Sequence, residues 1–219
     1  MRLVEAATEL FVERGYAATT LADVAEHAGL APRTLYLRFP TKADLLLRCV
    51  GVAIAGDGDA VPIAGRTWMT GTLTAPTLGE RLGLMAAVTA TLMSRSVDLL
   101  GVAHQAAATE PAIAAAAQAG REETRRVLGE FWRRIDEDGL LPAACDVEWL
   151  TETATLLAHA DTFLLLRRTT GWDVSSYRDW LERTWTRLVG SSAEPIGSTR
   201  RDRTAGAPRR PASPPTIRR

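Results

Sequence analysis

The stretch "GLAPRTLYLRFPTKADLL", residues 29–46, reads as a turn, a helix of barely two turns and the start of a further helix. Pro32 suits the first turn of the short helix, and Pro40 stops it because proline has no N–H to donate and clashes with the preceding turn. At about 100° per residue, Leu35 and Phe39 lie with Pro32 in one narrow arc, which predicts the packed side. The positions outside that arc are Arg33, Thr34, Tyr36, Leu37 and Arg38. So short a helix contributes little stability by itself, and its outward side chains are therefore predicted to carry the function.

Two more helices are predicted before this stretch. Apolar residues at i, i+4, i+7 and i+8 from Leu3 to Phe11 predict the first helix, and Gly15 ends it. The segment "TTLADVAEHAG" predicts the second helix, because Thr20 and Asp23 form a capping-box-like start. The short helix that follows is joined to it by the turn "GLA", residues 29–31. Two helices joined by so short a turn form a helix-turn-helix unit.

A helix-turn-helix unit fits its second helix into the major groove of DNA. Arg33 or Arg38 can bind a guanine edge with both guanidinium nitrogens, Thr34 can bond a base or a phosphate, and Tyr36 can reach a phosphate. Helix starts hold phosphates well, which adds two threonines and a lysine to the set. The predicted DNA-binding residues are Thr19, Thr20, Arg33, Thr34, Tyr36, Leu37, Arg38 and Lys42.

The overall charge gives no support to nucleic-acid binding, because 26 basic and 26 acidic residues balance over the 219 positions. The local charge is more favourable. Between Arg33 and Arg48 the sequence contains four basic residues and one acid, Asp44. Residues 1–50 as a whole contain six of each sign.

The rest of the chain also predicts an all-α fold, with no alternating strand pattern of useful length. Helices are predicted over residues 41–55, 77–96, on either side of Pro111, over 121–139, 147–168 and 175–189. Residues 56–76 have no period and predict a loop with at most a short helical piece. The Arg- and Pro-rich end of the chain predicts disorder. We divide the chain into a helix-turn-helix domain (1–45), a helical effector-binding and dimerisation domain (46–190) and a disordered tail (191–219).

Several classes of protein are excluded or disfavoured by motif. The sequence contains no HExxH, GxSxG or phosphate-loop pattern, so we expect no enzymatic activity. Cys49 and Cys145 form no CxxC pair, and we expect no metal site, no cofactor and a reduced, cytoplasmic setting. The most apolar run, residues 156–166, is interrupted by His159 and Asp161 and is too short to span a bilayer.

The ordered segment "AATELFVERGYAATTLADVAEHAGLAPRTLYLRFPTKADLL", residues 6–46, strongly resembles the DNA-binding domain of TetR-type transcriptional regulators. The matching marks are "LF…GY..TT", "A..AG", "TLY..F" and the opening of the next helix from Lys42 to Leu45. The resemblance implies a three-helix DNA-binding head, a helical effector-binding body, and a homodimer through the last two body helices (about 147–168 and 175–189). It also implies a repressor that a small molecule releases from a near-palindromic operator.

Two departures from the family pattern affect the head. Arg33 stands where a small residue usually precedes "TLY", which predicts a changed operator preference. The chain also starts directly at the first predicted helix, whereas relatives often have a short basic arm. Either those phosphate contacts are absent or the true start lies upstream of Met1.

The predicted body is rich in Ala, Leu and Trp, which favours a mainly apolar effector. The same composition is also typical of a hydrophobic core without a ligand. Candidate pocket residues are Trp68, Met85, Met93, His104, Trp132, His159 and Phe163. For any single one of them, a place in the core or an interface is the favoured interpretation. Another group of residues lies on or beside the last predicted helix and would serve a dimer interface at least as well as a pocket: Trp172, Trp180, Leu181, Trp185 and Leu188.

Two alternatives stay open at this point. The same head would serve an activator, or a regulator with no small-molecule effector. From another class, the chain could be a helical dimer that binds a small molecule or a protein partner without sequence-specific DNA binding.

Overall fold

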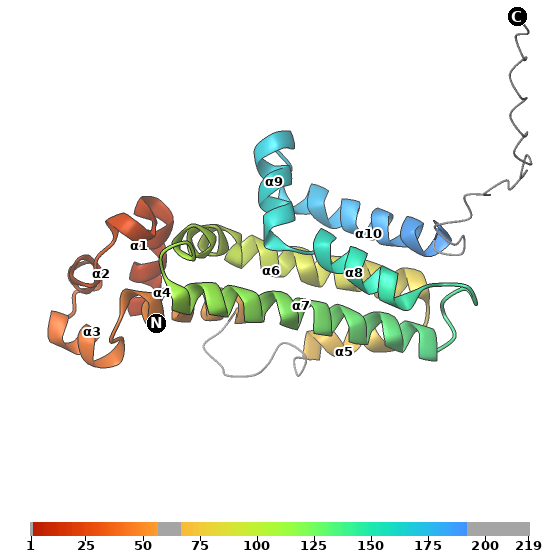
Figure 1. The fold of residues 1–219 in the computed structure, drawn as a ribbon, viewed down its shortest axis with the longest axis horizontal. Helices are drawn as coiled ribbons and strands as arrows, with labels where there is room; N and C mark the ends of the chain where they lie inside the picture. Colours follow the sequence, from red (N-terminus) through yellow and green to blue (C-terminus); the bar gives the residue numbers. More distant parts are fainter. Residues whose placement is uncertain (1, 57–66, 192–219) are drawn as a thin grey trace, which may run out of the picture.

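The computed structural model describes residues 2–56 and 67–191, and within these ranges the secondary structure is entirely helical (Figure 1). The prediction of an all-α fold is therefore confirmed. The helices are α1 (Arg2–Ala18), α2 (Leu21–His27), α3 (Pro32–Arg38), α4 (Lys42–Ala55), α5 (Thr67–Thr74), α6 (Leu78–Ala106), α7 (Pro111–Glu137), α8 (Val147–Leu157), α9 (Ala160–Thr170) and α10 (Val174–Ser191). The predicted tail lies outside the described residues, apart from the end of α10.

The helices form two units, which we call the head (α1–α4) and the body (α5–α10). Figure 1 shows the head at one extremity of an elongated molecule, with α6 and α7 running along the body. α4 continues without interruption through the predicted boundary between residues 45 and 46, so the exact division stays a prediction.

The core of the head is completed by the body. Fully buried apolar side chains from the first four helices meet in one cluster, among them Phe11, Val24, Leu35, Leu45 and Leu46. Leu99, Ala103 and Ala106 of α6 and Ile113 of α7 belong to the same cluster. The head therefore packs directly on the end of the body where α6 turns into α7.

The core of the body is a second cluster, which contains large aromatic side chains. Trp132 of α7 and Trp185 of α10 are both 0% exposed, and Leu181 is buried beside Trp185. Because Leu181 and Trp185 are inside one protomer, the interpretation of these two residues as a seam between protomers is wrong. Trp172, Trp180 and Leu188 are only half-buried.

The long helices extend beyond their predicted limits. The helix predicted to end at residue 96 continues to Ala106, because Val97, Leu99 and Ala103 prolong its buried stripe. The Ala-rich stretch after Pro111 and the segment 121–139 form one helix, α7. Tertiary packing thus decides the helix ends that local sequence leaves open.

The helix predicted over residues 147–168 is broken into α8 and α9, so that prediction is wrong. At His159 the backbone leaves the helical region, with ψ of 145°. Two carbonyl groups freed by the break accept hydrogen bonds from side chains: Thr162 donates to Leu156 at 2.6 Å, and Tyr177 donates to Leu157 at 2.8 Å. Neither proline nor glycine marks the break, so the sequence offered no local signal.

α6 is the one helix among the described residues that is long and apolar enough, by length and composition, to cross a membrane. Its buried side chains include Leu82, Met85, Val97 and Leu99, and they belong to the two cores. The core helix of a soluble protein passes the same test.

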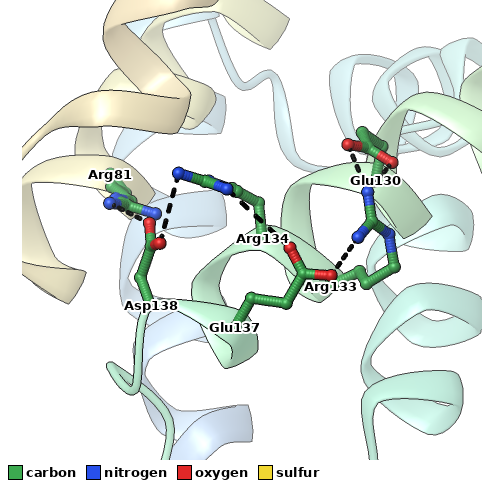
Figure 2. A network of polar contacts seen from close by, with 6 residues as sticks. All are labelled: Arg81, Glu130, Arg133, Arg134, Glu137 and Asp138. Carbon is green, nitrogen blue, oxygen red and sulfur yellow. Dashed lines mark hydrogen bonds and ion pairs between the residues drawn. The ribbon is translucent and has the colours of Figure 1, made fainter.

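A polar network ties together the end of the body that lies farthest from the head (Figure 2). Arg81 of α6 is 5% exposed; its Nη2 atom lies 2.6 Å from Asp138 Oδ2, and its Nε atom donates to the Ala75 carbonyl at 2.8 Å. Arg134 pairs with the other oxygen of Asp138 at 3.3 Å. The network joins the start of α6 to the C-terminal end of α7.

We expect Asp138→Asn to lower the free energy of unfolding by about 3 kcal/mol, because it leaves the buried Arg81 charge without its counter-ion. Glu137→Gln is the matched control, since Glu137 pairs with arginines on the exposed part of the same network. Its cost should be below about 1 kcal/mol. Urea unfolding followed by circular dichroism measures both, and equal costs would contradict the special role of the buried pair.

Candidate nucleic-acid interface and ligand cavity

The turn between α2 and α3 is set by local signals. Thr20 caps α2: its hydroxyl accepts from the Asp23 N–H at 3.1 Å, and the Asp23 carboxylate accepts from the Thr20 N–H at 2.9 Å. Gly29 has a φ of +66°, which the turn requires and which favours glycine. Pro32 is the first residue of α3, and α3 ends at Arg38 ahead of Pro40. The predicted helix-turn-helix is therefore present.

One side chain holds α3 to the rest of the head. Leu35 is 0% exposed and is the only buried residue of α3, while Phe39 just after the helix is half-buried. Pro32 is exposed, so it does not pack with these two as predicted. Because a single leucine occupies the core, the remaining surface of α3 faces away from the head.

The outward face of α3 contains every residue that the sequence predicted for it. Leu37 is 77% exposed and Tyr36 is 51% exposed, which is unusual for side chains with so much apolar surface. Arg33, Thr34 and Arg38 are also exposed. Within the described residues neither arginine forms an ion pair, so both guanidinium groups are available to an incoming anion. Figure 1 shows α3 at the end of the molecule.

Thr19 is not part of this surface, so the prediction that it contacts DNA is wrong. Its side chain is 0% exposed, and its hydroxyl lies 2.8 Å from the Gly15 carbonyl and 3.2 Å from the Leu10 carbonyl, to which it donates. A group with no exposed surface cannot reach a phosphate. Thr20, its neighbour, is exposed, and its O–H remains available because its oxygen only accepts in the cap.

Lys42 is half-buried at the start of α4. Its Nζ atom donates to the Tyr16 carbonyl at 2.7 Å and lies 4.2 Å from the centre of the Tyr16 ring. The lysine thus holds the end of α1 against the start of α4. Its predicted contact with a phosphate stays a prediction.

Gly15 shapes the end of α1. Its φ of +79° and ψ of 171° are not helical, and they kink the chain so that residues 16–18 form a separate last turn. Only glycine adopts this region of backbone space at low cost. The kink directs Tyr16 toward the body.

A cavity of about 660 Å³ lies between α6 and α7, and residues of α4 and of the break between α8 and α9 also line it. This volume is in the range of roughly 300–1,000 Å³ that is typical of small-molecule sites. Along α6 the lining extends from Met85 to His104, which is roughly 30 Å of helix at 1.5 Å per residue. The cavity is therefore elongated and reaches from the body core to the head.

The wall of the cavity is mainly apolar. Its three hydroxyl side chains, Thr89, Ser96 and Thr124, each donate to the carbonyl four residues earlier in the same helix. The charged and ionisable groups of the wall are Arg121 and Glu123 of α7 and a cluster in which Asp161 lies 3.4 Å from His104 Nδ1 and 3.3 Å from His159 Nδ1. Within the described ranges, no group of three or more His, Cys, Asp or Glu side chains is arranged so that it could hold a metal ion.

The structure brings together four of the seven candidate pocket residues: Met85, Met93, His104 and His159 all line the cavity. Trp132 and Phe163 do not line it, because both are buried in the body core, where Phe163 stacks on Tyr177 at 4.6 Å. The side chain of Trp68 lies outside the described residues. Sequence reasoning missed the alanines of α7, including Ala114, Ala116 and Ala117, whose small side chains leave the space open.

The fold and the outward face of α3 define the class of protein: an all-helical chain with a helix-turn-helix head on a body that contains a cavity. Residues 3–49 match the family model described as bacterial regulatory proteins, tetR family. Over these residues the chain is similar to the N-terminal domain of that family. Members of the family are DNA-binding regulators and not enzymes, which agrees with the expectation that the chain has no catalytic activity.

The similarity to curated relatives extends over 45–47 residues. The HTH-type transcriptional regulator TtgR of Pseudomonas putida is 47% identical over 45 residues, which cover 20% of this chain and 21% of TtgR. The fatty acid metabolism regulator protein of Bacillus subtilis is 38% identical over 47 residues, 22% of this chain and 24% of that protein. The matched part thus spans about a fifth to a quarter of these relatives.

Over most of its length the chain is similar to solved structures in fold, at low sequence identity. The crystal structure of MexZ, a repressor from Pseudomonas aeruginosa, superposes with a TM-score of 0.62 and covers 87% of this chain and 92% of MexZ. The sequence identity is 20%, so this likeness shows the fold alone.

We expect Gly15→Ala to lower the free energy of unfolding by about 1–3 kcal/mol, because alanine is strained at a φ of +79°. The added methyl group meets no atom within 4 Å, so the cost is conformational and not steric. Gly51→Ala, in the middle of α4 with the same free space, is the control and should be neutral or stabilising by up to about 1 kcal/mol. Equal effects in urea unfolding would contradict the role assigned to the kink.

Proposed function

We propose that the protein is a homodimeric, DNA-binding transcriptional regulator that represses its target until a small, mainly apolar effector releases it from a near-palindromic operator. The observation that carries the proposal is the outward face of α3, where Arg33 and Arg38 are exposed beside Tyr36 and Leu37. A helix held by one buried leucine and placed at the extremity of the molecule can enter a major groove without other changes in the head. Its two arginines supply the donors that read guanine.

The dimer is proposed to form through the region of the last body helices, α8–α10. Leu156 of α8 is 69% exposed and Leu165 of α9 is 61% exposed, so both leave large apolar surface in contact with water. A two-fold interface would bury such side chains and would set two heads at a fixed separation, as a palindromic site requires. A setting in the cytoplasm, where the chain has access to DNA, is part of the proposal.

Release by an effector is supported by the position of the cavity. Leu47, Val50 and Ile54 of α4 line it, so a ligand there contacts the helix that connects the body to the head. A ligand that binds one spacing of the heads better than another shifts the population toward that spacing. MexZ, which shares this fold, is a key repressor, and a repressor role for this chain is part of the proposal.

The proposed chemistry of the effector follows from the side chains that line the cavity. Because the cavity hydroxyls are occupied within their own helices, an effector gains mainly from burial of apolar surface. A polar group on the effector would lie near the cluster of His104, Asp161 and His159 or near Arg121 and Glu123 of α7. We therefore propose an elongated apolar molecule with few polar groups.

For DNA binding, we expect Arg38→Ala and Tyr36→Ala to weaken binding to a duplex recovered by selection from random DNA. A lost base contact costs about 1–3 kcal/mol, and a lost phosphate contact also lowers the dependence of binding on salt. Fluorescence anisotropy of a labelled duplex at several salt concentrations measures both quantities.

Arg125→Ala is the matched control for this experiment, because Arg125 is an exposed arginine of α7 that pairs with Glu152 in the body. It should bind DNA like the parent. If Arg38→Ala and Tyr36→Ala also bind like the parent, the face of α3 is not the reading surface. Recovery of no motif at moderate salt would favour the alternative of a helical dimer without sequence-specific DNA binding.

For the cavity, we expect Ala117→Trp to weaken binding of the neutral apolar dye N-phenyl-1-naphthylamine by about tenfold or more, equivalent to about 1.4 kcal/mol. Ala117 lines the cavity, so an indole at this position occupies the space of the dye. Fluorescence titration measures the affinity.

Ala119→Trp is the matched control, because Ala119 lies two residues further along α7 on its exposed side. It should bind the dye like the parent. Equal loss of affinity in the two variants, or none in either, would show that the dye does not occupy this cavity.

A further inference from the structure

A chain of polar contacts links the body to the head through Tyr16. The Tyr16 hydroxyl donates to Glu110 Oε1 at 2.9 Å, across 94 residues of sequence. The Tyr16 carbonyl accepts from Lys42 Nζ at 2.7 Å, and the lysine also lies over the Tyr16 ring. One tyrosine thus contacts the turn between α6 and α7 through its hydroxyl and the start of α4 through its backbone and ring.

Glu110 lies at the start of α7, where its side chain would be expected to cap the helix. It is the N-cap residue of α7, yet its side chain makes no capping hydrogen bond. Its carboxylate instead accepts a hydrogen bond from the Tyr16 hydroxyl. Partial burial and the neighbouring carboxylate of Glu110 raise the pKa of Tyr16, so the hydroxyl remains a donor throughout the physiological pH range.

The turn that contains Glu110 is also the end wall of the cavity. Ala107 and Ala108 precede Glu110, Ile113 and Ala114 follow it, and all four line the cavity. On the other side, Tyr16 lies four residues before Thr20, the cap of α2. Besides the direct contact of α4 with the cavity, one route from the cavity wall to the helix-turn-helix unit therefore consists of this side-chain hydrogen bond and a few residues of backbone.

We propose that the hydrogen bond between Tyr16 and Glu110 is the positioning contact through which occupancy of the cavity changes the placement of the helix-turn-helix unit. This inference rests on the proposed function for its biological use. An apolar molecule between α6 and α7 displaces the turn at residues 107–110, and Glu110 transmits the displacement to Tyr16. Because Lys42 holds Tyr16 to α4, the end of α1 and the start of α4 respond together.

The test measures hydrogen–deuterium exchange with and without N-phenyl-1-naphthylamine, and it needs no operator. In the parent protein the dye should change amide exchange in residues 16–28 by at least about fivefold, the lower end of typical coupling between sites. In Tyr16→Phe this dye-dependent change should disappear, while dye affinity stays within about threefold of the parent. Glu110→Gln should retain part of the change, since the amide oxygen can still accept from the tyrosine.

Tyr177→Phe is the matched control, because it removes a tyrosine hydrogen bond of similar length, 2.8 Å, within the body. It should keep the full dye-dependent change. A purely structural role for Tyr16 would alter exchange equally with and without dye, so the difference between the two conditions separates positioning from stability.

The inference is overturned if the dye binds the parent but leaves residues 16–28 unchanged, or if Tyr16→Phe responds like the parent. Failure of the dye to bind the parent overturns the cavity and this inference together. Failure to recover an operator contradicts the proposed function alone, because the exchange experiment contains no DNA. Where an operator is recovered, the parent should bind the dye at least about fivefold more weakly in its presence, and Tyr16→Phe should show no such difference.

Discussion

The structure depends on the shared core between the head and the end of the body. Leu99, Ala103 and Ala106 of α6 and Ile113 of α7 complete a cluster that otherwise belongs to the first four helices. A head of about 50 residues buries too small a fraction of its surface to be strongly stable alone. The body therefore supplies part of the apolar contact that keeps the head folded. A movement of the turn between α6 and α7 consequently changes the packing of the head core.

This constraint explains how one short helix can remain exposed. α3 contributes a single buried side chain, Leu35, and the rest of the head core comes from its neighbours. The side chains of Arg33 and Arg38 are therefore exposed and do not belong to the core of the head, as the sequence predicted. The cavity follows from the same arrangement: α6 and α7 run side by side, and small residues such as Ala114 and Ala117 leave space between them.

Much of the head could be predicted because its signals are local. The capping boxes at Thr20 and Thr41 and the prolines around α3 act within a few residues of themselves, and the structure contains each of them. The body was less predictable. The length of α6 and the break at His159 depend on side chains that arrive from other helices. One of these is Tyr177, whose hydroxyl belongs to no local pattern and donates to the carbonyl of Leu157.

The sequence by itself determined the helical class, the helix-turn-helix unit and the outward face of α3, because periodicity, caps and breakers are properties of neighbouring residues. Only the tertiary structure decided that Thr19 is buried, that Met85, Met93, His104 and His159 share a cavity, and that Tyr16 meets Glu110. These facts involve residues far apart in the chain. Their contacts are set by the packing of whole helices, and no local pattern records how two helices will meet.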